Sequence, residues 1–209
     1  IMTSGNVSDD PIIFENDEAL RKLRNVADLF LVHDRDIVRP LDDSVSRIAC
    51  REPLLIRLGR GYAPAEFKTP HTAKAIVGVG GQLKNTIAYA TGDRILLSQH
   101  IGDLGSSATR IRHSATISDI VALMDAAPRT IATDFHPDFA STPPSSSQTT
   151  LPVQHHLAHI HACLVDNEIN TPVLGVAWDG AGLGTDGGLW GGEFIEVDGS
   201  RWRRVAHVR

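Results

Sequence analysis

The stretch VQHHLAHIHAC at residues 153–163 places four histidines within seven residues. Its apolar spacing predicts a helix over 154–166, and helical residues four positions apart lie on one face. His155 and His159 have this spacing, so both imidazoles can bind one metal ion. An exposed polar helix is the alternative interpretation. We therefore expect this helix to carry part of a metal site.

A second stretch, WDGAGLGTDGGLWGGEF at residues 178–194, follows a predicted buried strand at 172–178. Asp179 stands at the end of that strand, where the sheets of α/β proteins place their ligands. Its carboxylate can complete a site of two histidines and one carboxylate. The glycines predict a loop over 179–192 whose backbone N–H groups can hold phosphate. A long flexible loop without a ligand is the alternative.

Outward from these two stretches, hydrophobic spacing predicts short elements in the order of an α/β domain that opens with a β-meander. The polar residues 66–74 predict a linker, and the Ser/Thr/Pro-rich residues 141–150 predict an exposed loop. Further predicted strands are 54–58, 75–79, 86–90, 94–98, 130–133 and 194–197, and further helices are 17–31 and 117–126, the second capped by Thr116 or Ser118.

The composition is that of an ordinary globular protein. Of 209 residues, 42% are hydrophobic and 22% charged, which argues against a disordered, collagen-like or disulfide-stapled chain. A net charge of −5 gives no basic footprint for nucleic acid. There is no apolar run long enough to span a membrane and no signal peptide, and the two cysteines form no CxxC pair. We expect a cytoplasmic protein without a nucleic-acid or membrane partner.

Three weaker motifs can also contact anions. TSGN at residues 3–6 combines small hydroxyl residues with a glycine, although a plain turn is the simpler explanation. HDRDIVRPLDDSV at 33–45 offers arginines for a carboxylate or phosphate, or a solvated charged loop. GGQLKNT at 80–86 can cradle a polyphosphate or form an ordinary hairpin turn, and it lacks the P-loop pattern.

Taken together, these stretches resemble the HypF family, the carbamoyltransferases that mature NiFe-hydrogenases. They run in the family's order over nearly the whole chain. The matching stretches are MTSGN at 2–6, HDRDIVRPLDDSV at 33–45, RGYAP at 60–64, GGQLKNT at 80–86, SQHIGDL at 98–104, DFHPDF at 134–139, VQHHLAHIHAC at 153–163 and WDGAGLGTDGGLWGGEF at 178–194.

The resemblance implies two pieces of α/β structure. Residues 1–65 are similar to the C-terminal part of a YrdC-like domain, which activates a carbamoyl group with ATP. Residues 75–209 are similar to the N-terminal part of a TsaD-like domain of the actin, sugar-kinase and heat-shock-protein superfamily, and 66–74 would link the two. Both ends of the chain break off within a pattern, so we expect a piece of a longer protein.

The implied reaction is ATP-dependent carbamoyl transfer from carbamoyl phosphate through carbamoyl adenylate. The acceptor would be the C-terminal cysteine of a HypE-type partner, and its product would be dehydrated to the cyanide ligand of the hydrogenase. The implied cofactors are ATP with Mg²⁺ and a divalent metal, iron or zinc.

Site roles are carried over only onto matching positions. Gln82 stands where we expect glutamate in the family, which removes a charge beside the implied phosphate loop. The implied metal ligands are His155, His159 and Asp179, the implied catalytic residues are Lys84 and Asn85, and the implied nucleotide contacts are Ser4, Asn6, Gly180, Gly182, Gly184, Gly187 and Gly188.

Three alternatives stay open. A tRNA threonylcarbamoyl transferase and a small-molecule O-carbamoyltransferase could share the paired histidines and the glycine-rich stretch. The third is an inactive truncated fragment: we expect the isolated 209-residue chain to be unstable or oligomeric and to lack transferase activity.

Overall fold

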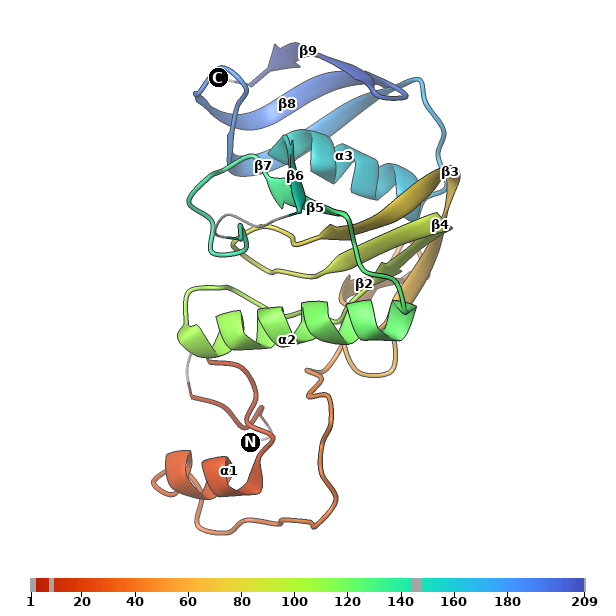
Figure 1. Cartoon of the computed structure of the whole chain (residues 1–209). Helices are drawn as coiled ribbons and strands as arrows, with labels where there is room; N and C mark the ends of the chain where they lie inside the picture. Colours follow the sequence, from red (N-terminus) through yellow and green to blue (C-terminus); the bar gives the residue numbers. More distant parts are fainter. Residues whose placement is uncertain (1–2, 8–9, 144–147, 209) are drawn as a thin grey trace.

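Three β-sheets follow one another along the described chain, together with three helices (Figure 1). This computed structural model describes residues 3–7, 10–143 and 148–208. The predicted mixed α/β class is confirmed, with sheets of two, four and three strands over these residues. The predicted exposed loop at 141–150 lies partly outside the described residues, and its last two residues begin a strand.

The N-terminal part holds one short helix and a hairpin. Helix α1 spans Asn16–Lys22, and strands β1 (Val45–Ala49) and β2 (Glu52–Arg57) pair antiparallel. The helix predicted over 17–31 is therefore too long. None of the residues of α1 is buried, and apolar side chains beyond its end, such as Leu29 at 90% exposure, face solvent. Without a surface to cover, apolar spacing alone does not extend a helix.

The central sheet has the order β4-β3-β5-β6. Strand β3 (Ala65–Gly78) pairs antiparallel with β4 (Ala88–Leu97), whereas β5 (Thr130–Asp134) and β6 (Thr149–Val153) add parallel pairings. The polar segment 66–74, predicted as a linker between the two pieces, lies in β3 and pairs with β4, Phe67 lying opposite Ile95. The strands predicted at 86–90 and 94–98 are one strand.

Helix α2 (Ser107–Met124) runs along one side of the central sheet (Figure 1). It begins ten residues before the predicted start at 117, because Ser106, not Thr116 or Ser118, caps it by accepting a hydrogen bond from the backbone N–H of Thr109. No helix among the described residues is both long and apolar enough to cross a membrane. The core between helix and sheet consists of Val77, Val79, Ile87, Tyr89, Ile101, Leu104, Ile120 and Ile131.

The same helix also holds the N-terminal part of the chain. The Arg112 guanidinium donates to the backbone carbonyl of Ile12 at 2.9 Å, and the side chain of Arg112 is only 9% exposed. Arg39 forms an exposed ion pair with Asp119 at 3.2 Å. The first contact joins residues 100 positions apart and the second joins residues 80 positions apart, and both connect the two pieces that the sequence predicts.

The third sheet has the order β7-β8-β9, with β7 (Val173–Leu183), β8 (Leu189–Asp198) and β9 (Arg201–His207) antiparallel. Helix α3 (His155–Asp166) packs on β7 close to its predicted bounds, capped by Gln154. The glycine-rich loop predicted over 179–192 is wrong because strand pairing continues on both sides of a short turn. The core of this part consists of Ile160, Ala177, Trp190, Ile195 and Val197.

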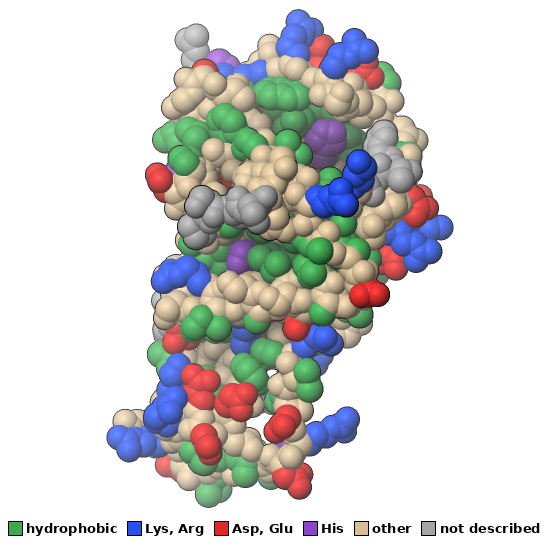
Figure 2. Space-filling view, viewed as in Figure 1, with side chains coloured by type: hydrophobic (Ala, Val, Ile, Leu, Met, Phe, Trp, Pro, Cys, Tyr) green, Lys and Arg blue, Asp and Glu red, His purple; other side chains and the backbone are tan. Residues whose placement is uncertain are grey.

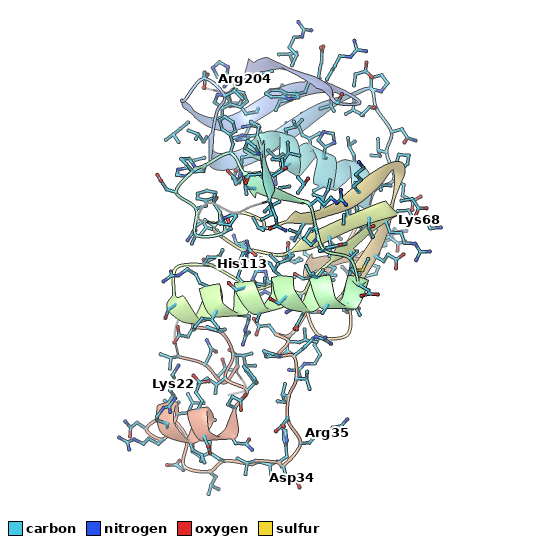
Figure 3. All side chains as sticks on the ribbon, viewed as in Figure 1. Lys22, Asp34, Arg35, Lys68, His113 and Arg204 are labelled. Atoms are coloured by element: carbon cyan, nitrogen blue, oxygen red, sulfur yellow. The ribbon has the colours of Figure 1, made fainter. Side chains whose placement is uncertain are left out.

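A buried ion pair joins β8 to β9. Glu193 is 1% exposed and accepts two hydrogen bonds from the Arg204 guanidinium, which lies 4.3 Å from the ring centre of Trp190. Arg204 is labelled on this sheet in Figure 3. Burial alone raises the pKa of Glu193, but the hydrogen bonds from Arg204 and Gly191 hold it below its usual value. The pair therefore stabilises the sheet at neutral pH, and this contribution is lost as the pH falls through the lowered pKa.

We predict that Glu193→Gln weakens this sheet by about 2–3 kcal/mol, because Arg204 loses a buried counter-ion. Hydrogen exchange of the β8 and β9 amides measures the change in the full-length gene product that carries this chain. The matched control is Glu196→Gln on the same strand, whose pair with Arg203 is exposed and should contribute less than about 1 kcal/mol. Equal protection in both variants would contradict the prediction.

Candidate metal centre

Two histidines and one carboxylate meet where α3 begins beside β7. His155 and His159 project from the first turns of the helix, and Asp179 projects from the strand. The Nε2 atom of His155 lies 3.0 Å from Oδ2 of Asp179 and 3.2 Å from Nε2 of His159. The third separation, between His159 Nε2 and Asp179 Oδ2, is 3.8 Å. The sequence-predicted group is thus brought together around one point.

These separations fit one shared ion. Atoms bound about 2.1 Å from a metal at angles of 90–110° lie about 3.0–3.4 Å from one another. Two of the three separations fall in this range, and the third exceeds it by a few tenths of an ångström. Imidazole and carboxylate donors together suit iron or zinc. The residues present therefore fit the metal that the resemblance implies.

Asp134 orients the first of these ligands. It ends β5, its side chain is only 7% exposed, and its Oδ2 lies 2.6 Å from Nδ1 of His155. The hydrogen bond to Asp134 raises the pKa of His155. Burial alone raises the pKa of Asp134, yet the hydrogen bond from His155 brings it below its usual value. A carboxylate behind a ligating histidine is a common metal-site arrangement because it fixes the tautomer and the ring orientation.

The hydrogen bond to Asp134 also explains why a cation belongs in this place. When Nδ1 of His155 donates its proton to Asp134, Nε2 presents a lone pair toward Asp179. Within the described part of the chain, the buried Oδ2 of Asp179 has no hydrogen-bond partner. A lone pair and a carboxylate oxygen 3.0 Å apart repel each other unless a proton or a metal ion lies between them. Sequence reasoning assigned no role to Asp134, although the DFHPDF stretch at a strand end was the available signal.

The glycines predicted to contact a nucleotide have other partners here. Gly180 and Gly182 lie in β7, and Gly180 donates its N–H to its neighbour Asp179. In the following turn, the N–H groups of Gly184, Gly187 and Gly188 donate to a carbonyl or carboxylate within the same turn. The N–H groups of Gly180, Gly184, Gly187 and Gly188 are therefore engaged within the chain. Nucleotide contact at these positions stays a prediction.

The two predicted catalytic residues of the GGQLKNT loop, Lys84 and Asn85, have different surroundings. Asn85 is 1% exposed and donates to the carbonyls of Val79 and Gly81 at 2.9 and 2.7 Å, so it builds the turn. Lys84 is exposed beside it. His113, labelled on α2 in Figure 3, supports the same turn with Nε2 3.0 Å from the carbonyl of Val79. The structure thus gives Asn85 a supporting position and leaves Lys84 available to a ligand.

The GGQLKNT loop contacts the segment that follows Asp134, whereas the N-terminal motif lies elsewhere. Gln82 accepts a hydrogen bond at 2.8 Å from Ala140, which belongs to the loop that follows Asp134. Ser4 and Asn6 bond to each other in the N-terminal part, near α1 (Figure 1). The N-terminal motif is therefore separate from the GGQLKNT loop and from the segment that follows Asp134.

A groove of about 370 Å³ opens beside the metal candidate, between α3 and β7. His159 and Asp179 contribute to one part of its lining, and Cys163 and the exposed Trp178 contribute to the rest. An ion held at the three ligands can therefore be reached by another molecule.

The fold and the group formed by His155, His159 and Asp179 define an α/β domain with a candidate metal site. The comparison with protein families agrees with this class. The HypF Kae1-like domain model matches residues 71–166, and the model of the second subdomain of the carbamoyltransferase Kae1-like domain matches 175–209. The Sua5/YciO/YrdC model, described as telomere recombination, matches 1–59. The chain belongs to the HypF family of carbamoyltransferases. The boundaries predicted at 65 and 75 stay predictions.

Named relatives agree over the whole chain. Carbamoyltransferase HypF of Synechocystis is 44% identical over 100% of this chain, and that of Rhizobium leguminosarum is 40% identical over the same share. The chain spans about 28% of the length of each. A solved full-length HypF in a phosphate- and nucleotide-bound form superposes with a TM-score of 0.93 at 39% identity, over 99% of this chain and 33% of its own length. HypF of T. kodakarensis has a TM-score of 0.89 at 31% identity, over 100% of this chain and 28% of its own.

We predict that Asp134→Asn lowers the affinity of this group for a divalent metal by about tenfold or more, because a neutral amide orients and polarises His155 less. Titration of the metal-stripped full-length gene product with Zn²⁺ against a chromophoric chelator measures the change. Asp138→Asn, an exposed isosteric change on the loop that follows Asp134, should leave the affinity unchanged. Equal affinities of both variants and the unmodified protein would show that Asp134 has no such role.

Proposed function

We propose that the full-length protein carrying this chain is an ATP-dependent carbamoyltransferase of NiFe-hydrogenase maturation. It would take the carbamoyl group from carbamoyl phosphate, activate it as carbamoyl adenylate and transfer it to the C-terminal cysteine of a HypE-type partner. The modified cysteine would then become the source of the cyanide ligand. Family membership supports the reaction class, and the group formed by His155, His159 and Asp179, with Asp134 behind it, carries the proposal.

In this proposal each described residue has a limited task. His155, His159 and Asp179 hold the iron or zinc ion, which when bound supplies a positive charge that stabilises developing negative charge on oxygen. Asp134 keeps the lone pair of His155 aimed at that ion. Lys84, exposed on a turn that Asn85 holds, can pair with a phosphate of ATP, whose Mg²⁺ would come with the nucleotide.

Carbamoyl adenylate should hydrolyse readily, so the site that makes it and the site that consumes it should exchange it away from water. The chain carries parts of both family units, and Arg112 of the Kae1-like part donates to the backbone of the N-terminal part. Such a connection supports transfer within one protein. The chain spans about 28% of the length of its named relatives, and we expect the 209-residue piece alone to lack transferase activity.

The charge distribution favours a reaction on small molecules and a protein partner over a reaction on tRNA. The free cysteines favour the cytoplasm. Basic and acidic side chains are interspersed on the face shown in Figure 2, most visibly over the N-terminal part, and the net charge is −5. A phosphate backbone is normally bound by clustered positive charge. Both cysteines are free thiols, as expected in a reducing compartment.

The test replaces the two paired histidines in the full-length gene product. We predict that His155→Ala and His159→Ala each remove bound metal, measured by elemental mass spectrometry, together with carbamoyl transfer to the HypE-type partner, measured by the mass of its C-terminal peptide. His161→Ala is the matched control, since His161 belongs to the same helix but not to the group of three, and it should retain both.

Full retention of metal and transfer in the His155 and His159 variants would refute the proposed site. Modified tRNA or a carbamoylated small molecule, formed in place of a modified partner cysteine, would refute the proposed acceptor.

A further inference from the structure

Helix α3 and strand β7 lie close together at two glycines that flank Asp179 in the sequence. Gly175 lies four residues before Asp179 and Gly182 three residues after it, both in β7. A Cβ atom added at Gly175 would lie 2.6 Å from the nearest atom of the Ile160 side chain, and one added at Gly182 would lie 2.7 Å from Cε1 of His156. Such distances are well below ordinary van der Waals contact.

The contact at Gly182 reaches the metal ligand itself. The same added Cβ would lie 3.0 Å from both Cβ and Cδ2 of His155, whose Nε2 faces Asp179. His155 and its buried neighbour His156 therefore both occupy the space where a side chain of residue 182 would lie. Gly182 has no positive φ, so its backbone conformation does not require a glycine. The requirement comes from the lack of room for a side chain.

The start of the helix cannot easily move away from the strand. His156 is 0% exposed, and its Nδ1 lies 3.1 Å from Nε2 of Gln154. The same amide donates to the carbonyl of Leu183 at 3.3 Å, and the Gln154 side-chain oxygen caps the helix through the N–H of Leu157. The first turn of α3 is thus fastened to the residue next to Gly182. Farther along, buried Ile160 against Gly175 limits any tilt of the helix.

We propose that Gly182 is a positioning residue of the metal centre: its missing side chain lets β7 lie close enough to α3 for His155 and Asp179 to share one ion. The inference rests on the metal site of the proposed function and goes beyond it, because it assigns the glycine a role in metal affinity through packing and not through phosphate. A methyl group at this position should separate the histidine from the carboxylate.

The experiment measures metal affinity separately from folding. Apo forms of the full-length gene product, with and without Gly182→Ala, are titrated with Co²⁺ and Zn²⁺, and their unfolding and far-ultraviolet circular dichroism are recorded without metal. We expect at least a tenfold loss of affinity and an altered Co²⁺ absorption spectrum in the Gly182→Ala protein that remains folded. Gly105→Ala is the control, because Gly105 is not among the glycines with positive φ and an added Cβ there has no atom within 4 Å.

A second variant tests the contact itself. His156→Ala removes the ring whose Cε1 lies nearest, so Gly182→Ala should cost less affinity in a His156→Ala background than in the unmodified protein. If Gly182→Ala alone fails to fold, the comparison is made between His156→Ala and the double variant. The remaining 3.0 Å contacts with His155 still predict weaker Co²⁺ binding in the double variant.

Unchanged Co²⁺ and Zn²⁺ affinity in folded Gly182→Ala, or an unchanged affinity on adding it to His156→Ala, would overturn the inference while leaving the proposed function intact. Failure of the unmodified protein to bind either metal would overturn the metal site and the inference together. A lower unfolding temperature with unchanged affinity would show that Gly182 serves packing alone.

Discussion

The hydrogen bond between Asp134 and His155 is the interaction on which the candidate site depends. Asp134 ends a strand of the central sheet, and His155 begins the helix that packs on the third sheet. The bond therefore joins two separately formed cores at the point where the ligand atoms gather. Because the Asp134 side chain is nearly buried, the loss of its charge partner would leave a desolvated carboxylate, so both groups favour the paired arrangement.

The same bond makes the site a place where a proton and a metal ion compete. With Nδ1 of His155 engaged by Asp134, the space between Nε2 and Asp179 admits one positive charge. A proton there satisfies two groups, whereas a metal ion also engages His159. Buried His156 shows the opposite behaviour, since burial lowers its pKa and favours the neutral ring. Adjacent histidines on one helix thus have different chemistry because their surroundings differ.

Sequence reasoning recovered the parts of this arrangement that depend on local spacing. The helix from 155 to 166 and the shared face of His155 and His159 follow from helical periodicity. Asp179 joins them as predicted, although it lies within β7 and not at the end of a strand. Asp134 could not be found in this way, because it lies 21 residues before its partner and only the packing of sheet against helix brings them together. The helix predicted over 17–31 is longer than α1 for a related reason, since periodicity does not reveal whether an apolar face will be covered.

The glycines between residues 175 and 192 show why composition alone misled the prediction of a loop. A glycine can serve a turn, expose an N–H group or permit close packing, and these uses leave the same letter in the sequence. Gly187 has φ +77° and serves a turn, whereas Gly175 and Gly182 lie in a paired strand against a helix. The two glycines are seven residues apart, which would place them on opposite faces of a regular strand. The register shift between Trp178 and Gly182 brings both against α3, and spacing alone does not reveal it. A glycine-rich stretch next to a histidine-bearing helix therefore indicates close packing as readily as phosphate binding.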